Sequence, residues 1–128
     1  MSDDKGTILY IDDNETNLEF VRRILIRHGY SCFVTTSASD GLQKSLELLP
    51  DLILLDIQMP EMNGFEVLKQ LRKLSLLNHT KFIAATANAM DGDRKMCLDA
   101  GFDGYLAKPI LKFELLKTIE TYMNTAHK

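Results

Sequence analysis

The stretch Leu52-Ile53-Leu54-Leu55-Asp56-Ile57-Gln58-Met59-Pro60 determines the fold that this sequence predicts. Its first four residues are apolar without alternation, which is the pattern of a central parallel β-strand covered on both faces. A carboxylate follows at once, and in α/β proteins ligands bind at the carboxyl ends of parallel strands. We therefore expect Asp56 to lie at the rim of a buried sheet, where a functional site would be built.

Two other apolar runs of the chain end in charged residues. Asp12-Asp13 closes the run Ile8-Leu9-Tyr10-Ile11, and Lys108-Pro109 closes the run Tyr105-Leu106-Ala107. If these runs are parallel strands of the same sheet, their carboxyl ends meet at one edge. Three acids and one lysine from distant parts of the chain are then expected to converge on one rim.

Strand and helix patterns alternate along the whole chain. Strands are predicted at residues 7–11, 31–35, 52–55, 81–86 and 105–107, and each is followed by the pattern of an amphipathic helix. Five strands alternating with five helices over short connections imply right-handed crossovers and a doubly wound α/β fold with a parallel sheet. No linker or repeat interrupts the pattern, so we expect residues 1–128 to form one domain with a core of about residues 7–123.

The helix patterns also predict caps and buried stripes. Thr16 and Glu19 indicate a capping box for the first helix, Ser37 begins the second, and Asn63 begins the third, which is expected to end before Asn78. The fourth helix is expected from about residue 92 to residue 100. The positions predicted to be buried, helix by helix in chain order, are Leu18, Val21, Leu25 and His28; Leu42, Leu46 and Leu49; Phe65, Leu68 and Leu71; Met96 and Cys97; and Phe113, Leu116, Ile119 and Met123. Each stripe would cover one face of the sheet.

Composition and charge exclude several classes of function. The chain has 128 residues and 45% hydrophobic content, enough for one compact core. The net charge of -3 comes from 18 acids and 15 bases without a basic run, which argues against direct nucleic-acid binding. Neither a GxGxxG nor a P-loop motif is present, so nucleotide binding has no support.

Cysteines and hydropathy indicate the compartment. Cys32 and Cys97 form no CxxC pair and are expected to be reduced and structural. The N-terminal residues contain no apolar signal region, and no apolar stretch approaches the roughly 18 residues of a membrane span. We therefore expect a cytoplasmic protein that does not bind membranes.

Four short motifs stand at or just after the predicted strand ends. They are Ile11-Asp12-Asp13-Asn14, Asp56-Ile57-Gln58-Met59-Pro60-Glu61-Met62-Asn63-Gly64, Ala85-Thr86-Ala87 and Leu106-Ala107-Lys108-Pro109. In these motifs the chain resembles the CheY-like receiver domain of two-component response regulators, from residue 7 to about residue 123. The resemblance implies a flavodoxin-like fold with a five-stranded parallel sheet in the order 2-1-3-4-5, flanked by five helices. The stretch from Thr86 to Asp93 is similar to stand-alone receivers of the DivK type and to receivers attached to hybrid kinases.

The resemblance implies a phosphorylation-activated signalling switch in a two-component phosphorelay, not an enzyme with a separate substrate. Asp56 would accept a phosphoryl group from the phosphohistidine of a histidine kinase or a histidine phosphotransfer protein. Mg2+, for which Mn2+ could substitute, would be held by Asp12, Asp13, Asp56 and the backbone carbonyl of Gln58.

The resemblance also implies roles for the residues of the switch. Lys108 would contact the phosphoryl oxygens, and its bond to the following proline is expected to be cis. Thr86 matches the hydroxyl that closes on the phosphoryl group, and Tyr105 matches the aromatic side chain that turns inward as Thr86 moves. This change would remodel a face built from the fourth helix, fifth strand and fifth helix, where a downstream effector protein would bind. Gln58 and Asn88 occupy positions that line the path of the hydrolytic water in this family.

The residue types suit this chemistry. Phosphoryl transfer needs an in-line nucleophile and neutralisation of charge on the transferring oxygens, and a fixed carboxylate is sufficient as the nucleophile. Adjacent carboxylates repel one another by about 4 kcal/mol per pair at ~4 Å with an effective dielectric near ~20, so the empty site is expected to be strained. A divalent cation with oxygen ligands relieves the repulsion, and Lys108 supplies a compact positive charge.

Two other functions fit parts of the pattern. Mg2+-dependent phosphatases of the haloacid dehalogenase type also use an aspartyl nucleophile after a strand, but they carry a second Asp two places on, where this chain has Gln58. A constitutive interaction module with the same fold would not need to retain all of Asp12, Asp13, Asp56, Thr86 and Lys108. Because no catalytic or DNA-binding domain follows Met123, we expect the output to be a protein contact.

Overall fold

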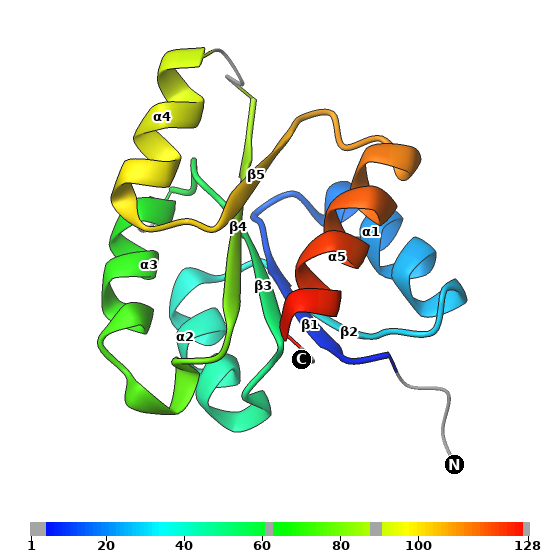
Figure 1. Cartoon of the computed structure of the whole chain (residues 1–128), viewed down its shortest axis with the longest axis horizontal. Helices are drawn as coiled ribbons and strands as arrows, with labels where there is room; N and C mark the ends of the chain where they lie inside the picture. Colours follow the sequence, from blue (N-terminus) through cyan, green and yellow to red (C-terminus); the bar gives the residue numbers. More distant parts are fainter. Residues whose placement is uncertain (1–4, 61–62, 88–90, 127–128) are drawn as a thin grey trace.

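Five strands and five α-helices alternate along the chain, as shown in Figure 1. The structure is a computed structural model, and it describes residues 5–60, 63–87 and 91–126. In chain order the elements are β1 (Thr7–Ile11), α1 (Glu15–Arg27), β2 (Ser31–Thr35), α2 (Ala38–Leu48), β3 (Leu52–Asp56), α3 (Gly64–Arg72), the 3-10 turn η1 (Ser75–Leu77), β4 (Lys81–Thr86), α4 (Asp91–Ala100), β5 (Gly104–Ala107) and α5 (Lys112–Ala126).

The five strands form one parallel sheet in the order β2-β1-β3-β4-β5. This confirms the predicted fold class and strand order. β3 lies in the middle, and every residue from Leu52 to Asp56 is buried, as its unbroken apolar run indicates. The winding direction reverses between β1 and β3, so the carboxyl ends of these two strands flank the crevice in which doubly wound folds bind ligands.

Helices cover both faces of the sheet (Figure 1). α1 and α5 pack on one face, against a buried apolar cluster that includes Tyr10 of β1 and Leu54 of β3. α2, α3 and α4 pack on the other face, against a second cluster that includes Leu9 of β1. Because strand residues alternate between the faces, Asp12 and Asp56 follow Tyr10 and Leu54 on the side of α1 and α5.

Side-chain caps begin the helices. Asn14 Oδ1 accepts a hydrogen bond of 3.0 Å from the backbone N–H of Asn17 and caps α1. The predicted capping box at Thr16 is wrong, because the cap lies earlier, immediately after the acid pair. Asn63 Oδ1 accepts a hydrogen bond of 3.0 Å from the backbone N–H of Glu66, which confirms the predicted start of α3.

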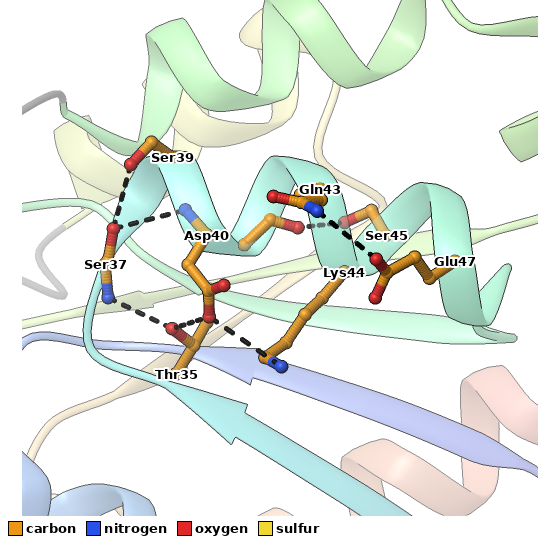
Figure 2. A network of polar contacts seen from close by, with 9 residues as sticks. Thr35, Ser37, Ser39, Asp40, Gln43, Lys44, Ser45 and Glu47 are labelled. Carbon is orange, nitrogen blue, oxygen red and sulfur yellow. Dashed lines mark hydrogen bonds and ion pairs between the residues drawn. The ribbon is translucent and has the colours of Figure 1, made fainter.

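A polar network ties the end of β2 to the first turn of α2 (Figure 2). Ser37 Oγ accepts a hydrogen bond of 3.1 Å from the backbone N–H of Asp40, which confirms Ser37 as the cap. The Thr35 hydroxyl donates to Asp40 Oδ2 at 2.7 Å and accepts from the backbone N–H of Ser37 at 3.2 Å. The connection after β2 is therefore fixed by side chains as well as by the backbone.

The predicted apolar stripe of α2 is wrong at Leu46 and Leu49, whereas Leu42 is partly buried and packs against the second cluster. Leu46 is 44% exposed and Leu49 is 38% exposed. The residues of α2 that are buried instead are Ala38, Gly41 and Ser45. A Cβ atom on Gly41 would lie 2.5 Å from Ile11 Cδ1, so this helix approaches the sheet too closely for large side chains at the contact. Leu46 and Leu49 consequently lie away from the contact.

The predicted phase is wrong for one residue in each of the last two helices. Met96 is 55% exposed and Phe113 is 74% exposed, whereas the neighbouring Cys97 and Leu115 are buried. The buried series of α5 is Leu115, Ile119 and Met123. This repeat of four residues defines the packed side of the helix and places Phe113 on the far side. Within the part of the chain that the structure describes, no helix has both the length and the apolar character needed to cross a membrane.

α3 ends before Asn78, as predicted. Its last residue is Arg72, and the 3-10 turn Ser75–Leu77 precedes β4. The turn buries Leu77, which is 2% exposed. The apolar pattern continues past the helix because this turn also contributes to the core, not because the helix itself extends.

Candidate functional site

Asp56 ends the central strand at the predicted rim. It pairs with Ala85 of β4 and is only 2% exposed. Its Oδ1 atom accepts a hydrogen bond of 3.2 Å from the backbone N–H of Gln58 and lies 3.0 Å from Lys108 Nζ. Its Oδ2 atom is buried and has no hydrogen-bond partner among the residues that the structure describes. One carboxylate oxygen is therefore held in place, and the other is left for a ligand.

Asp12 and Asp13 follow β1 beside Asp56. Asp12 is fully buried, whereas Asp13 is exposed. One carboxylate oxygen from each of the three acids can be chosen so that all three lie within 4.8 Å of one another. The strand ends thus bring the three acids together as the sequence predicted.

Asp12 is held by several hydrogen-bond donors. Its Oδ2 atom accepts from the Tyr10 hydroxyl at 2.5 Å and lies 3.1 Å from Lys108 Nζ and 3.4 Å from Asn17 Nδ2. Its Oδ1 atom accepts from the backbone N–H of Asn14 at 2.9 Å. The sequence reasoning assigned Tyr10 only to a strand and missed this contact. The available signal was a tyrosine in an otherwise aliphatic run, two residues before an acid and so on the same side of the strand.

Lys108 supplies the positive charge of the site. Its peptide bond to Pro109 is cis, as expected, and its backbone N–H donates to the carbonyl of Thr86 at 2.8 Å. Its Nζ atom contacts both Asp12 and Asp56. Burial alone would lower the pKa of Lys108, but the hydrogen bonds to Asp56 and Asp12 outweigh burial and raise this pKa. A charged ammonium therefore bridges the two buried carboxylates, which explains how they tolerate each other at this distance.

Burial controls the electrostatics of the site. Burial raises the pKa of Asp56 to about 6, and the negative charge of Asp12 adds to this rise. The hydrogen bonds from Lys108 and from the Gln58 N–H limit the rise. Asp56 is thus ionised at neutral pH, but its charge is costly. Burial and then the hydrogen bond to Asp12 raise the pKa of Tyr10 far above its ordinary value, so the phenol stays protonated and acts as a donor.

Thr86 and Tyr105 lie on neighbouring strands near the acids. Thr86 is 4% exposed and ends β4, one residue beyond the partner of Asp56. Tyr105 on β5 is half-buried and pairs with Ala84, which places it on the same face of the sheet as Thr86. The guanidinium carbon of Arg94 lies 5.5 Å from the centre of the Tyr105 ring. Thr86 therefore lies at the same end of the sheet as Asp56, and Tyr105 lies on the neighbouring strand on the same face as Thr86.

Two positions expected to line the path of water are less well defined. The Gln58 side chain is exposed, and its backbone N–H holds Asp56. Asn88 lies outside the described residues, as do Glu61 and Met62 of the motif that begins at Asp56. The Gln58 carbonyl as a metal ligand and the influence of Asn88 on hydrolysis therefore stay predictions.

The acid cluster fits a hard divalent cation. Mg2+ takes oxygen ligands and is usually bound by one or two carboxylates together with phosphate oxygens and water. The carboxylates of Asp12, Asp13 and Asp56 supply oxygens of this kind, and one oxygen from each lies within 4.8 Å of the others. The donor set thus matches the cation that the sequence resemblance implies.

Comparison with known proteins places the whole chain in one family. The family model for the response regulator receiver domain matches residues 8–120. The polar-differentiation response regulator DivK of Brucella ovis is 38% identical over 120 residues, which cover 94% of this chain and 98% of that protein. DivK of Brucella anthropi is 37% identical over 120 residues, with the same coverage.

Solved structures share the fold over nearly the same length. A CheY-like response regulator receiver domain protein from Methanospirillum hungatei has a TM-score of 0.85 and 31% identity, covering 94% of this chain and 95% of that chain. The chemotaxis protein CheY4 of Vibrio cholerae has a TM-score of 0.86 and 27% identity, covering 91% of this chain and 98% of that chain. Together with the motifs at the strand ends and the strand order, these matches show that the chain belongs to the family of response regulator receiver domains.

Proposed function

We propose that this receiver domain is a phosphorylation-dependent switch in which Asp56 accepts a phosphoryl group from the phosphohistidine of a histidine kinase or a histidine phosphotransfer protein. The observation that carries the proposal is the Oδ2 atom of Asp56, which is buried and, among the described residues, has no hydrogen-bond partner. A buried polar atom of this kind requires a partner, and the neighbouring charges favour an anionic group bound together with a cation.

The proposed transfer is a single displacement at phosphorus. Asp56 Oδ2 forms the new P–O bond, the P–N bond to the donor histidine breaks, and the electron pair of that bond stays on the imidazole nitrogen. The Gln58 N–H and Lys108 hold Oδ1, so the carboxylate is oriented before the donor arrives. Because the pKa of Asp56 is about 6, the nucleophile is ionised at neutral pH.

The acids and the lysine share the charge of the transferring group. Asp12, Asp13, Asp56 and the backbone carbonyl of Gln58 would hold Mg2+, or Mn2+ in its place. When bound, the cation neutralises the phosphoryl oxygens and relieves the repulsion among the acids. Lys108 already lies 3.0 Å from Asp56 Oδ1 and is therefore close enough to donate to a phosphoryl oxygen on the same carboxylate.

The switch would run from Thr86 to Tyr105. A new dianion on Asp56 attracts the Thr86 hydroxyl, and the movement leaves space into which Tyr105 turns. Support comes from the position of both residues on one face of neighbouring strands. Turning inward takes the Tyr105 ring away from Arg94 of α4, so the face formed by α4, β5 and α5 changes and an effector protein binds it.

The competing functions have less support. A phosphatase of the haloacid dehalogenase type would need an acid at the position of Gln58, and that side chain is an exposed amide. A constitutive scaffold would not need an unpartnered nucleophile beside two other acids. We further propose that residues 1–128 work as one domain without direct nucleic-acid or membrane binding, and the cytoplasmic location stays a prediction.

A small phosphodonor with Mg2+ tests the proposal. The wild-type protein and the variant Asp56→Asn are incubated with acetyl phosphate, with Mg2+ or with a chelator, and analysed by intact mass. We expect one phosphoryl adduct on the wild-type protein with Mg2+, and no adduct on the variant or in the chelator. An equal adduct on Asp56→Asn would show that another side chain is modified and would overturn the proposal.

A further inference from the structure

Tyr10 is a polar residue in the apolar centre of the sheet. β1 lies between β2 and β3 (Figure 1), and Tyr10 pairs with Val34 on one side and Leu54 on the other. The side chain is fully buried in the cluster beneath α1 and α5. A phenylalanine would fill nearly the same volume without bringing a hydroxyl that needs a partner. The hydroxyl is therefore the feature that packing does not explain.

The partner of this hydroxyl is the carboxylate of Asp12. Tyr10 donates to Oδ2, which also lies 3.1 Å from Lys108 Nζ, while Asn14 N–H donates to Oδ1. Asn17 Nδ2, at 3.4 Å, is a third group beside Oδ2. Together these donors fix the rotation of the Asp12 side chain. Oδ1 receives only the Asn14 N–H among the described residues, so one of its two lone-pair directions is left for a cation. Asp12 is completely buried, which makes each of these donors important for its charge.

Tyr10 differs from Lys108 in one respect. Lys108 also contacts Asp56, so its ammonium is shared and would gain a new acceptor when Asp56 is modified. The Tyr10 hydroxyl is buried in the core, and among the acids that the structure describes it donates to Asp12 alone. It can therefore hold the orientation of Asp12 in the unmodified and the modified states of the protein.

We propose that Tyr10 is a positioning residue of the cation site: its hydroxyl holds the Asp12 carboxylate in the orientation that binds the divalent cation and so sets the affinity of the unmodified protein for Mg2+. This inference rests on the proposed function, because it assumes that Asp12 is a ligand. The hydroxyl also withdraws some negative charge from Asp12, which would weaken binding. Orientation is the larger effect, because loss of a partner that orients a metal ligand typically lowers metal affinity by about 10-fold to 100-fold.

The test compares Tyr10→Phe with Tyr30→Phe. Tyr30 is a buried tyrosine of the same cluster, and its substitution provides a control for loss of a tyrosine hydroxyl away from Asp12, Asp13 and Asp56. Mg2+ affinity is measured by calorimetric titration of the unphosphorylated proteins. Near-UV difference absorbance gives a second signal, because the chain has 4 tyrosines and 0 tryptophans. Because the Tyr10 phenol donates to Asp12, its absorbance should change when Mg2+ binds that carboxylate.

We expect Tyr10→Phe to weaken Mg2+ binding about tenfold or more, and Tyr30→Phe to leave it unchanged. If Tyr10→Phe and the wild type bind Mg2+ with equal affinity, the role of Tyr10 is overturned but the proposed metal site is not, because the wild type still binds Mg2+. No Mg2+ binding by the wild type would overturn the proposed metal site and this inference together. If Tyr10→Phe does not fold, the difference spectrum decides. A tyrosine signal that Mg2+ induces in the wild type and that persists in Tyr30→Phe, Tyr105→Phe and Tyr122→Phe comes from Tyr10 and supports its role. If Mg2+ induces no such signal, the role of Tyr10 is overturned.

Discussion

Replacing Asp56 by Asn should stabilise the metal-free protein, and the gain should depend on pH. Burial raises the pKa of Asp56 from 3.8 to about 6, so the folded state binds a proton more tightly than the unfolded state. The free energy of unfolding therefore falls as the pH rises through about 6, and it recovers as the pH falls towards 4. A pKa rise of this size destabilises the folded protein by about 3 kcal/mol at pH values above the pKa of Asp56 in the folded state. Asn carries no charge and avoids this cost at every pH.

The size of the gain follows from the same linkage. At pH 7.5 the variant Asp56→Asn should be more stable than the wild type by about 3 kcal/mol, and at pH 5 by about 1.5 kcal/mol, because the wild-type carboxyl is then largely protonated. Other groups titrate in this range, but they are common to both proteins and cancel in the difference. The experiment is urea unfolding of both proteins at four pH values between 5 and 8 in the presence of a chelator.

Two results would refute this reasoning. If the stability difference between the two proteins is the same at every pH, Asp56 does not carry a raised pKa in the folded state. If the wild type is the more stable protein at pH 7.5, the contact between Asp56 and Lys108 outweighs the burial of the charge. Saturating Mg2+ provides the control, because it should stabilise the wild type more than the variant.

Three further changes probe the acids, the lysine and the fold. Asp13→Ala removes one like charge, so it should raise the Tm of the metal-free protein by a few degrees and abolish the rise in Tm that Mg2+ causes; an unchanged Mg2+ response would contradict the proposed ligand. Lys108→Met leaves two buried carboxylates without their cation and should lower the free energy of unfolding by about 3 kcal/mol at pH 7.5, with a smaller loss at pH 5; a loss that is independent of pH would contradict this account. Gly41→Ala places a Cβ 2.5 Å from Ile11 Cδ1 and should cost about 1 to 2 kcal/mol in urea unfolding. In an Ile11→Ala background, which lacks Cδ1, Cγ1 and Cγ2, the three atoms nearest that Cβ, the same change should be neutral or stabilising, and an equal cost there would refute the steric explanation.

The sequence predicted the sheet and the positions of the charged residues well. The run from Leu52 to Leu55 indicated a strand buried on both faces, and this one assignment placed Asp56 at a rim. The positions of Asp12 and Lys108 beside Asp56 could also be predicted, because parallel strands in a doubly wound sheet have their carboxyl ends at one edge. Strand order and the cis bond before Pro109 came from resemblance to a family and not from periodicity.

The helices and the contacts of the acids were harder to predict. Leucine spacing in α2 indicated a stripe at Leu46, but the buried face is set by how closely the helix backbone approaches Ile11, and this distance is not encoded in hydrophobicity. Phe113 was predicted on the packed side of α5, but the buried repeat of that helix begins at Leu115, which leaves Phe113 exposed. Tyr10 was missed because the run around it is apolar, so the hydroxyl gained meaning only when Asp12 was found beside it.

Locating the modified residue tests the central claim most directly. Borohydride reduces an acyl phosphate to an alcohol, so an aspartate that carries a phosphoryl group becomes homoserine and can be found by peptide mass mapping. After incubation with phosphodonor and Mg2+, the account predicts homoserine at position 56 alone, and none when a chelator replaces Mg2+. Homoserine at position 12 or 13, or a phosphoryl adduct that borohydride leaves intact, would contradict the claim that the unpartnered oxygen of Asp56 is the acceptor.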